Sequence, residues 1–212
     1  VADTLAVNIG SAVEKDLQKV VAEISRISSH ANLPHTKYIF NGQNISAKGI
    51  LHTIRTLPVK SDDVILFYFS GHGYRTKSKQ SPWPNLFLTR ENAGIDFDMI
   101  HREIAKRSPR LLIVFADVCN NIVPEIFAPP TTAKSFVYSD PKSSVNQAYK
   151  TLYRECAGQI LIAGAKTGEF AWCTSSGALL TEAWIKSMVQ EGEFGEQATW
   201  ETLLNRASVA IK

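Results

Sequence analysis

Val64-Ile65-Leu66-Phe67-Tyr68-Phe69-Ser70-Gly71-His72-Gly73 is the segment that decides the fold of this chain. Its apolar part, 64–69, is preceded by Ser61-Asp62-Asp63 and followed by Ser-Gly-His-Gly. A continuous apolar run between two turn signals is typical of a strand that is buried on both faces, as in a parallel sheet. Residues 111–116 form a second such run, which ends at Asp117-Val118-Cys119.

Amphipathic segments alternate with these apolar runs. Apolar residues recur at helical spacing after Ser46, for example, until Pro58 ends the pattern. Ser11, which opens a capping box with Glu14, is predicted to cap the first helix, as Ser46 and Thr199 do for two later ones. We predict helices over 11–27, 46–57, 96–107, 178–190 and 199–211, and strands over 4–9, 37–40, 64–69, 85–89, 111–116 and 159–165.

Composition excludes several classes of protein. The 212 residues are 44% hydrophobic and 20% charged, and the net charge of +3 gives no reason to expect a nucleic-acid partner. No apolar run approaches the ~18 residues of a membrane helix, so no membrane partner is expected. The odd number of cysteines leaves at least one thiol free, which favours a reducing, cytoplasmic location. The chain opens at Val1 without a basic leader, and we expect its natural start to lie upstream.

The candidate reactive residues follow the two apolar strands. Alternating strands and helices predict an α/β fold with a largely parallel sheet, whose ligand sites lie outside the carboxyl ends of the strands. His72 and Cys119 each follow such an end, so neighbouring strands would bring them to one edge. An imidazole can take the thiol proton and later protonate a leaving amine. The amides of Gly73 and Cys119 are placed to form an oxyanion hole.

These motifs resemble the caspase/metacaspase superfamily of cysteine peptidases. The match rests on Tyr68-Phe69-Ser70-Gly71-His72-Gly73 and on Asp117-Val118-Cys119, and the His72-to-Cys119 spacing is close to the ~50 residues of caspases. The resemblance implies a three-layer α/β sandwich: a mostly parallel central sheet of about six strands with helices on both faces. It also implies a polypeptide substrate, with Cys119 as nucleophile and His72 as general acid/base.

The resemblance is closer to metacaspases and paracaspases than to true caspases. True caspases carry Gln-Ala-Cys and cut after Asp, whereas this chain has Asp117 two residues before the cysteine. The resemblance implies that Asp16, Ser70 and Asp117 line the S1 pocket, where acidic groups favour Arg or Lys and repel Asp. It also places Trp172 beside that pocket.

The chain also departs from the metacaspase pattern. Asn120-Asn121 follows the nucleophile in place of His-Ser-Gly, and the loop 77–84 lacks the acidic insert of many metacaspases. No segment has the oxygen-ligand density of a calcium site, so neither a metal site nor an organic cofactor is expected, and calcium activation stays open.

The whole chain, 1–212, is expected to be one peptidase domain. Residues 1–123 would be the p20-like part with the dyad, 124–157 an irregular linker, and 158–212 the p10-like part. Self-cleavage is expected within 120–157, which contains basic residues that suit the predicted specificity: Lys134, Lys142, Lys150 and Arg154.

Several alternatives fit the same residues. A catalytically silent caspase-fold scaffold would keep both motifs with a blocked groove. A protease that cleaves after Asp would need a basic S1 pocket, against which Asp117 argues. A flavodoxin-like binding module would need a phosphate-binding glycine loop after the first strand, where only Gly10 stands. Both a monomer and a homodimer remain open.

Overall fold

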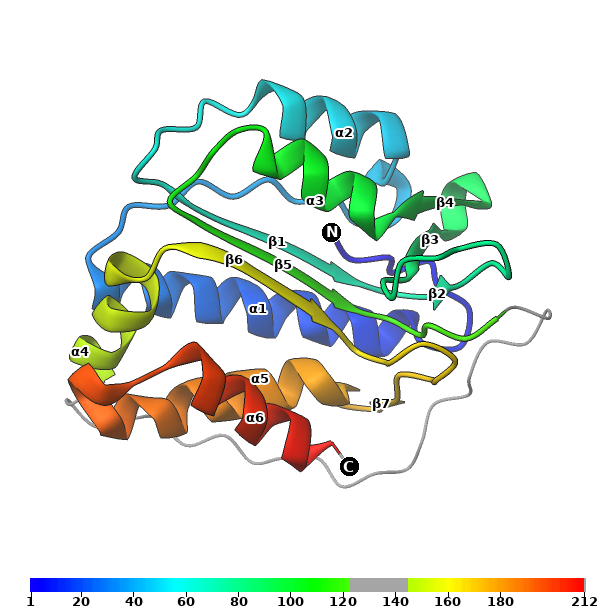
Figure 1. Ribbon diagram of the computed structural model, residues 1–212. Coiled ribbons are helices and arrows are strands. Elements are labelled where there is room, and N and C mark those ends of the chain that lie inside the picture. The colour runs from blue at the N-terminus through cyan, green and yellow to red at the C-terminus, as the bar shows by residue number, and fades with distance from the viewer. Residues whose placement is uncertain (123–144, 212) are drawn as a thin grey trace.

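A parallel sheet of three strands forms the centre of the molecule (Figure 1). The computed structural model describes residues 1–122 and 145–211. The sheet order is β1 (Val64–Ser70), β5 (Leu111–Asp117) and β6 (Gly158–Ala163). The register pairs Ser70 with Asp117, so the carboxyl ends of β1 and β5 lie side by side. The three apolar runs are thus confirmed as strands.

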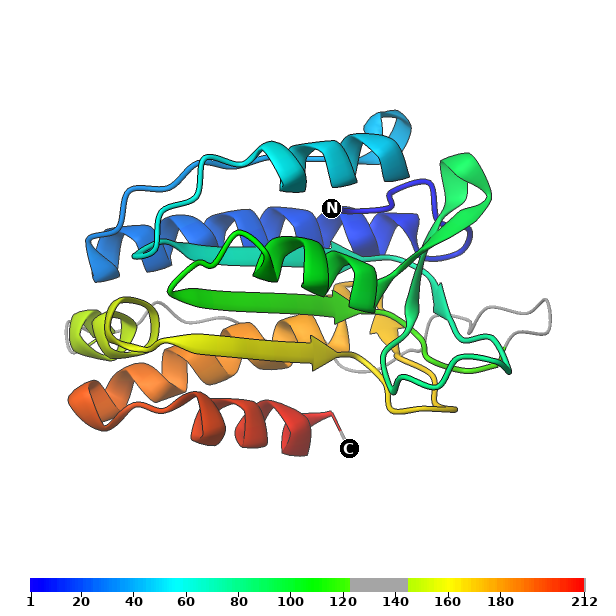
Figure 2. The same cartoon turned by 45° about the horizontal axis from the view of Figure 1, so that its top comes forward.

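Helices cover both faces of this sheet (Figures 1 and 2). α1 (Gly10–Ala31), α5 (Leu179–Glu191) and α6 (Trp200–Ala210) pack on one face, and α2 (Ala47–Thr56) and α3 (Phe97–Ala105) pack on the other. Successive side chains of a strand point to opposite faces. Leu111 of β5 accordingly belongs to the first core and Leu112 to the second. None of the helices in the described part of the chain is long and apolar enough to cross a membrane.

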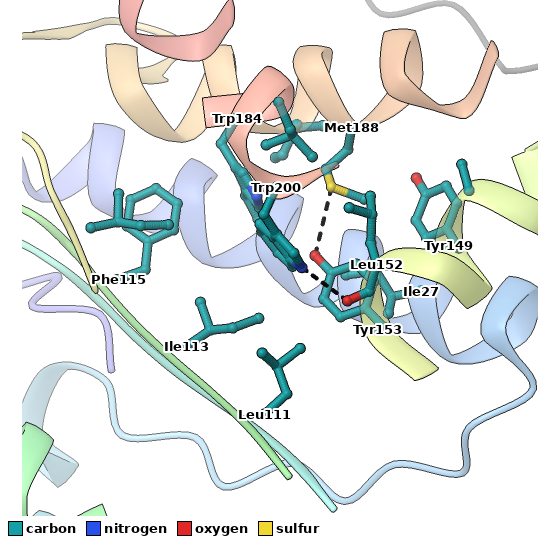
Figure 3. Packing of buried hydrophobic residues seen from close by; sticks show 14 of the residues in the cluster. Ile27, Leu111, Ile113, Phe115, Tyr149, Leu152, Tyr153, Trp184, Met188 and Trp200 are labelled. Atoms are coloured by element: carbon teal, nitrogen blue, oxygen red, sulfur yellow. Dashed lines mark hydrogen bonds between the residues drawn. The ribbon is translucent and has the colours of Figure 1, made fainter. Parts of the chain in front are cut away.

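The core beneath α5 and α6 is rich in aromatic residues (Figure 3). Trp184 and Phe115 meet edge to face at 5.4 Å between ring centroids. Trp200 Nε1 donates a 2.9 Å hydrogen bond to the carbonyl of Leu152, which satisfies the indole inside the core. These contacts tie the C-terminal helices to the sheet and to the segment before β6.

The prediction of an irregular linker over 124–157 is wrong for residues 145–155. Residues 145–155 form α4 (Val145–Tyr149) and a π-helical segment, η3 (Lys150–Glu155), in which Leu152 and Tyr153 are fully buried. Their apolar side chains drive this segment into the core rather than into solvent. Of the basic residues predicted as self-cleavage sites, Lys150 and Arg154 lie in η3, and Lys134 and Lys142 lie outside the described residues.

Among residues 1–122 and 145–211 the central sheet has three strands, where about six were expected. The other described strands are short and form two small antiparallel sheets at the carboxyl edge of the central one. The first contains β2 (Gly73–Tyr74), β3 (Asn85–Leu88) and β4 (Ala93–Asp96), and the second contains β7 (Cys173–Thr174) and β8 (Gly177–Ala178). Short 3₁₀ helices occur at η1 (Gly42–Asn44), η2 (Thr89–Glu91) and η4 (Gly192–Gln197).

Two expected strands do not form, which explains part of the difference. Residues 4–9 make local turns, in which Ala6 donates to the carbonyl of Asp3 and Gly10 to that of Ala6. Residues 37–40 are irregular. Next to them, Ala2 forms isolated β-bridges to Asn41 and to Ser70. The carbonyl of Phe40 accepts a 2.9 Å hydrogen bond from the amide of Ala2. Apolar content alone does not reveal that the backbone groups of residues 4–9 find partners within turns.

The predicted helix caps are confirmed at two of three positions. The side chains of Ser46 and Thr199 accept hydrogen bonds from the amides of Gly49 and Thr202. The predicted Ser11 cap is wrong, because α1 begins at Gly10 and its N-cap, Ile9, makes no side-chain bond. A Cβ on Gly10 would lie 2.4 Å from the carbonyl oxygen of Thr4. The close turn before α1 therefore sets the start of the helix.

Candidate active site

His72 and Cys119 lie at the same edge of the sheet, as their strand positions predict. Each comes two residues after the paired strand ends Ser70 and Asp117. One cavity opens at this edge, and its lining brings together residues from distant parts of the sequence. Among them are Asp16, Ser70, Gly71, His72, Asp117, Cys119, Trp172, Cys173 and Ala178.

The thiol of Cys119 is nearly enclosed, with 7% of the residue exposed. Its Sγ lies 3.6 Å from the carbonyl oxygen of Ala171, on the loop that follows β6. Gly73 packs directly behind it, since an added Cβ would lie 2.6 Å from the Cys119 carbonyl oxygen and 2.5 Å from Val118. Only glycine fits there, and Gly73 is not itself among the residues that line the cavity.

His72 is held by the backbone of the N-terminal segment. Its Nε2 lies 2.9 Å from the carbonyl oxygen of Val7. Because a carbonyl only accepts, Nε2 carries the proton in this bond, and Nδ1 is the nitrogen that would exchange protons. Burial lowers the pKa of His72 below its ordinary value, while the Val7 carbonyl and the charge of Asp3 act in the opposite direction. A neutral imidazole is the form that a general base requires.

Asp16 reaches the cavity from α1. Ser70 Oγ donates to its Oδ2 at 2.8 Å, and the backbone amide of Ala178 donates to its Oδ1 at 2.9 Å. Asp117 is held similarly, because the amide and the hydroxyl of Thr181 both donate to its Oδ2 at 2.8 Å. Ala178 and Thr181 belong to the N-terminal end of α5, where free amides and the helix dipole favour anions.

The two carboxylates are nevertheless held in an unfavourable environment. Burial raises the pKa of Asp16 to about 7, with a further contribution from the charge of Asp117, against the hydrogen bonds and the charge of Lys19. Burial likewise raises the pKa of Asp117 to about 6, against the bonds from Thr181. Lys19 is itself paired with Glu182. A cation entering the cavity would therefore meet carboxylates whose ionised form it strongly favours.

Sequence comparison identifies the family to which this arrangement belongs. A family model described as the caspase domain matches residues 15–212. The chain belongs to the caspase family. None of the curated proteins matches the chain significantly. The match confirms the predicted superfamily and its α/β fold, and it makes a cysteine peptidase the general activity of this family member. The closer resemblance to metacaspases stays a prediction.

The sequence-predicted residues of this caspase domain fall into two groups. Asp16, Ser70, His72, Asp117, Cys119 and Trp172 all line the cavity, whereas Gly73 packs against the backbone of Cys119 and is not among the lining residues. Trp172 is 42% exposed, and Phe170 lies beside it with ring centroids 6.1 Å apart. The tryptophan is therefore a residue of the cavity mouth rather than of the core.

Sequence reasoning missed two residues that hold the side chains of this caspase cavity in place. Val7 acts through its carbonyl, for which a side-chain pattern carries no signal. Thr181 lies in the first turn of α5, and a threonine there was a usable signal for anion binding. Cys173 places a second thiol in the cavity wall. Burial, then the charges of Asp16, Asp117 and Cys119, raise its pKa to about 11, so it is a poor nucleophile at neutral pH.

The raised pKa values of Asp16 and Asp117 predict a pH-dependent stability of the empty caspase domain. The pKa of Asp16 rises from 3.8 to about 7 and that of Asp117 from 3.8 to about 6. At a pH between the ordinary and the raised pKa, the folded state therefore binds more protons than the unfolded chain. A tenfold difference in acidity between the folded and unfolded states corresponds to about 1.4 kcal/mol of stability. This stability is present at low pH and is lost as pH rises from 4 to 7.

The double variant Asp16→Asn/Asp117→Asn lacks both titrating carboxyls. Comparing it with the wild type therefore separates their contribution to the pH dependence from that of other groups such as His72. Its Tm relative to that of the wild type should therefore increase from pH 4 to about pH 7 and then level off, measured by thermal unfolding in matched buffers. A Tm difference that stays constant over this range would show that the two carboxyls do not titrate as stated.

Proposed function

We propose that this caspase domain is an endopeptidase that cleaves polypeptides after Arg or Lys, with Cys119 as nucleophile and His72 as general acid/base. The observation that carries the proposal is the pair of buried carboxylates, Asp16 and Asp117, in the cavity that also holds the thiol and the imidazole. Catalysis and substrate selection would then occur at one edge of the sheet.

The chemistry would proceed in two stages. His72 takes the proton of Cys119 at Nδ1, and the thiolate attacks the scissile carbonyl carbon. The amides of Gly73 and Cys119 would hold the resulting oxyanion. His72 then protonates the leaving amine, which leaves an acyl-thioester. Water, deprotonated by His72, hydrolyses the thioester and restores the free thiol.

The selection of a basic P1 residue follows from the electrostatics of the cavity. Asp16, Ser70 and Asp117 line the cavity together with Cys119. An arginine or lysine side chain would pair with these groups and regain the solvation that burial removed from the carboxylates. An aspartate would add a third carboxylate to the same desolvated space, which disfavours cleavage after Asp.

The alternative of a silent scaffold is less well supported by the geometry. Trp172 lies at the mouth of the cavity and is partly exposed. His72 and Cys119 both line the same cavity. A scaffold has no need for a thiol and an imidazole directed to the same space.

Fluorogenic peptides that differ only at P1 test the proposal. We expect hydrolysis with Arg or Lys at P1 and none above background with Asp, assayed with and without calcium. The calcium arm separates an inactive chain from one that needs the ion. Cleavage after Asp would overturn the specificity, and the absence of cleavage in every arm would favour the silent scaffold.

A further inference from the structure

A buried arginine lies behind the nucleophile and outside the cavity. Arg75 follows β2 and is only 6% exposed. Its guanidinium donates to the carbonyls of Lys79, at 3.0 Å, and Ser81, and at 3.4 Å to that of Trp83. Within residues 1–122 and 145–211, no carboxylate forms an ion pair with it. A buried guanidinium that donates hydrogen bonds to several backbone carbonyls of one loop fixes the conformation of that loop.

Asn120, the residue directly after Cys119, is completely buried and joins the same network. Its Oδ1 accepts from Arg75 Nη1 at 3.4 Å, and its Nδ2 donates to the carbonyl of Pro82 at 2.7 Å and to that of Ala165 at 3.4 Å. Its backbone amide donates to Glu169 at 3.0 Å, and its carbonyl accepts from Gly168 at 2.8 Å. Every polar group of Asn120 is therefore engaged.

These bonds connect three loops that surround the nucleophile. Asn120 belongs to the loop after β5, Arg75 contacts the loop 79–83, and the partners of the Asn120 backbone lie in the loop 164–172. The third loop also supplies Ala171, whose carbonyl contacts Cys119 Sγ. The backbone of Arg75 adds a further link, because its amide donates to the carbonyl of Asn121 at 2.9 Å.

We propose that Arg75 and Asn120 are positioning residues, which hold the Cys119 thiol and amide at the angle that the reaction requires. This inference rests on the proposed peptidase function. The network touches neither thiol nor imidazole directly, and it acts by fixing the peptide segment that follows the nucleophile.

Arg110 offers a matched control at the opposite end of β5. It too donates to backbone carbonyls, those of Asp62, Tyr153 and Cys156, but it precedes the strand whose other end carries Cys119. Arg75→Lys and Arg110→Lys therefore remove comparable bonds near to and far from the site. Asn120→Ala provides a second variant should Arg75→Lys fail to fold.

The experiment compares kcat, KM, Tm and the iodoacetamide alkylation rate of Cys119, the last located by peptide mass mapping. Arg75→Lys and Asn120→Ala should lower kcat by about 10²-fold, because misplacement by about 1 Å has such an effect, with KM within about twofold. Alkylation should slow severalfold, because the thiol is displaced from its base. Arg110→Lys should lower Tm similarly and leave kcat and alkylation close to those of the wild type.

Two outcomes would overturn the inference and are separable from failure of the proposed function. Arg75→Lys and Asn120→Ala with the kcat and alkylation rate of Arg110→Lys would show a purely structural role. A wild type that hydrolyses no peptide would refute the proposed function. In that case the alkylation rates alone decide, and equal rates in all four proteins would refute positioning as well.

Discussion

Cys119→Ala is expected to lower kcat/KM for a peptide with Arg at P1 by about 10⁴-fold or more, the scale on which loss of a covalent nucleophile is measured. Cys173 cannot replace it, because the pKa of Cys173 is raised to about 11 and little thiolate forms there. The variant should fold normally, since the side chain becomes smaller and its bond to Ala171 is a weak sulfur contact. The measurement is steady-state hydrolysis together with a thermal unfolding curve.

Cys156→Ala is the matched control for this prediction. Cys156 follows η3 at the opposite end of the sheet from the cavity. Its removal should leave kcat/KM within about twofold, as for a substitution outside the catalytic machinery. Activity retained in Cys119→Ala would show that the hydrolysis has another origin, a contaminating peptidase included, and would remove the nucleophile assignment.

Asp117→Asn is expected to lower kcat/KM for Arg and Lys peptides by about 10²-fold or more, the loss typical when one member of a desolvated charge pair is truncated. An asparagine oxygen can still accept both bonds from Thr181, so the strand end and α5 should keep their contact. The pKa of Asp117 is raised to about 6 by burial, so the neutral amide should also stabilise the empty domain at pH 8.

Loss of activity together with gain of stability is the signature that identifies Asp117 as a binding group. Glu191→Gln is the control, because Glu191 is also fully buried but pairs with Arg206 at the far end of α5. It should lower stability and leave kcat/KM for Arg and Lys peptides within about twofold of the wild type. Equal cleavage of Arg peptides by Asp117→Asn and the wild type would remove Asp117 from the proposed S1 pocket.

Much of this site could be predicted from local patterns. The apolar runs before Ser70 and Asp117 indicated two buried strands, and the parallel arrangement then required His72 and Cys119 to share an edge. The helices capped by Ser46 and Thr199 were equally readable, because a cap is a bond between near neighbours in the chain. The predictions of strands at 4–9 and 37–40 were wrong, because apolar content alone does not show whether a segment pairs with a sheet. Residues 4–9 form turns and residues 37–40 are irregular.

The remainder depended on contacts between distant segments. The bonds that hold Asp16 and Asp117 at the start of α5 join residues far apart in the chain, and so do those of Asn120 to Pro82 and Ala165. The raised pKa values of the carboxyls depend on burial, which exists only once α1, the sheet and α5 have packed.

The sequence by itself determined the α/β class, the strand ends that carry His72 and Cys119, and the acidic character of their surroundings, because each of these depends on residue type and local spacing. The tertiary structure alone decided that Val7 orients His72, that α5 holds both carboxylates and that Arg75 and Asn120 brace the loop after Cys119. The physical reason is that desolvation and hydrogen-bond geometry are properties of packed surfaces.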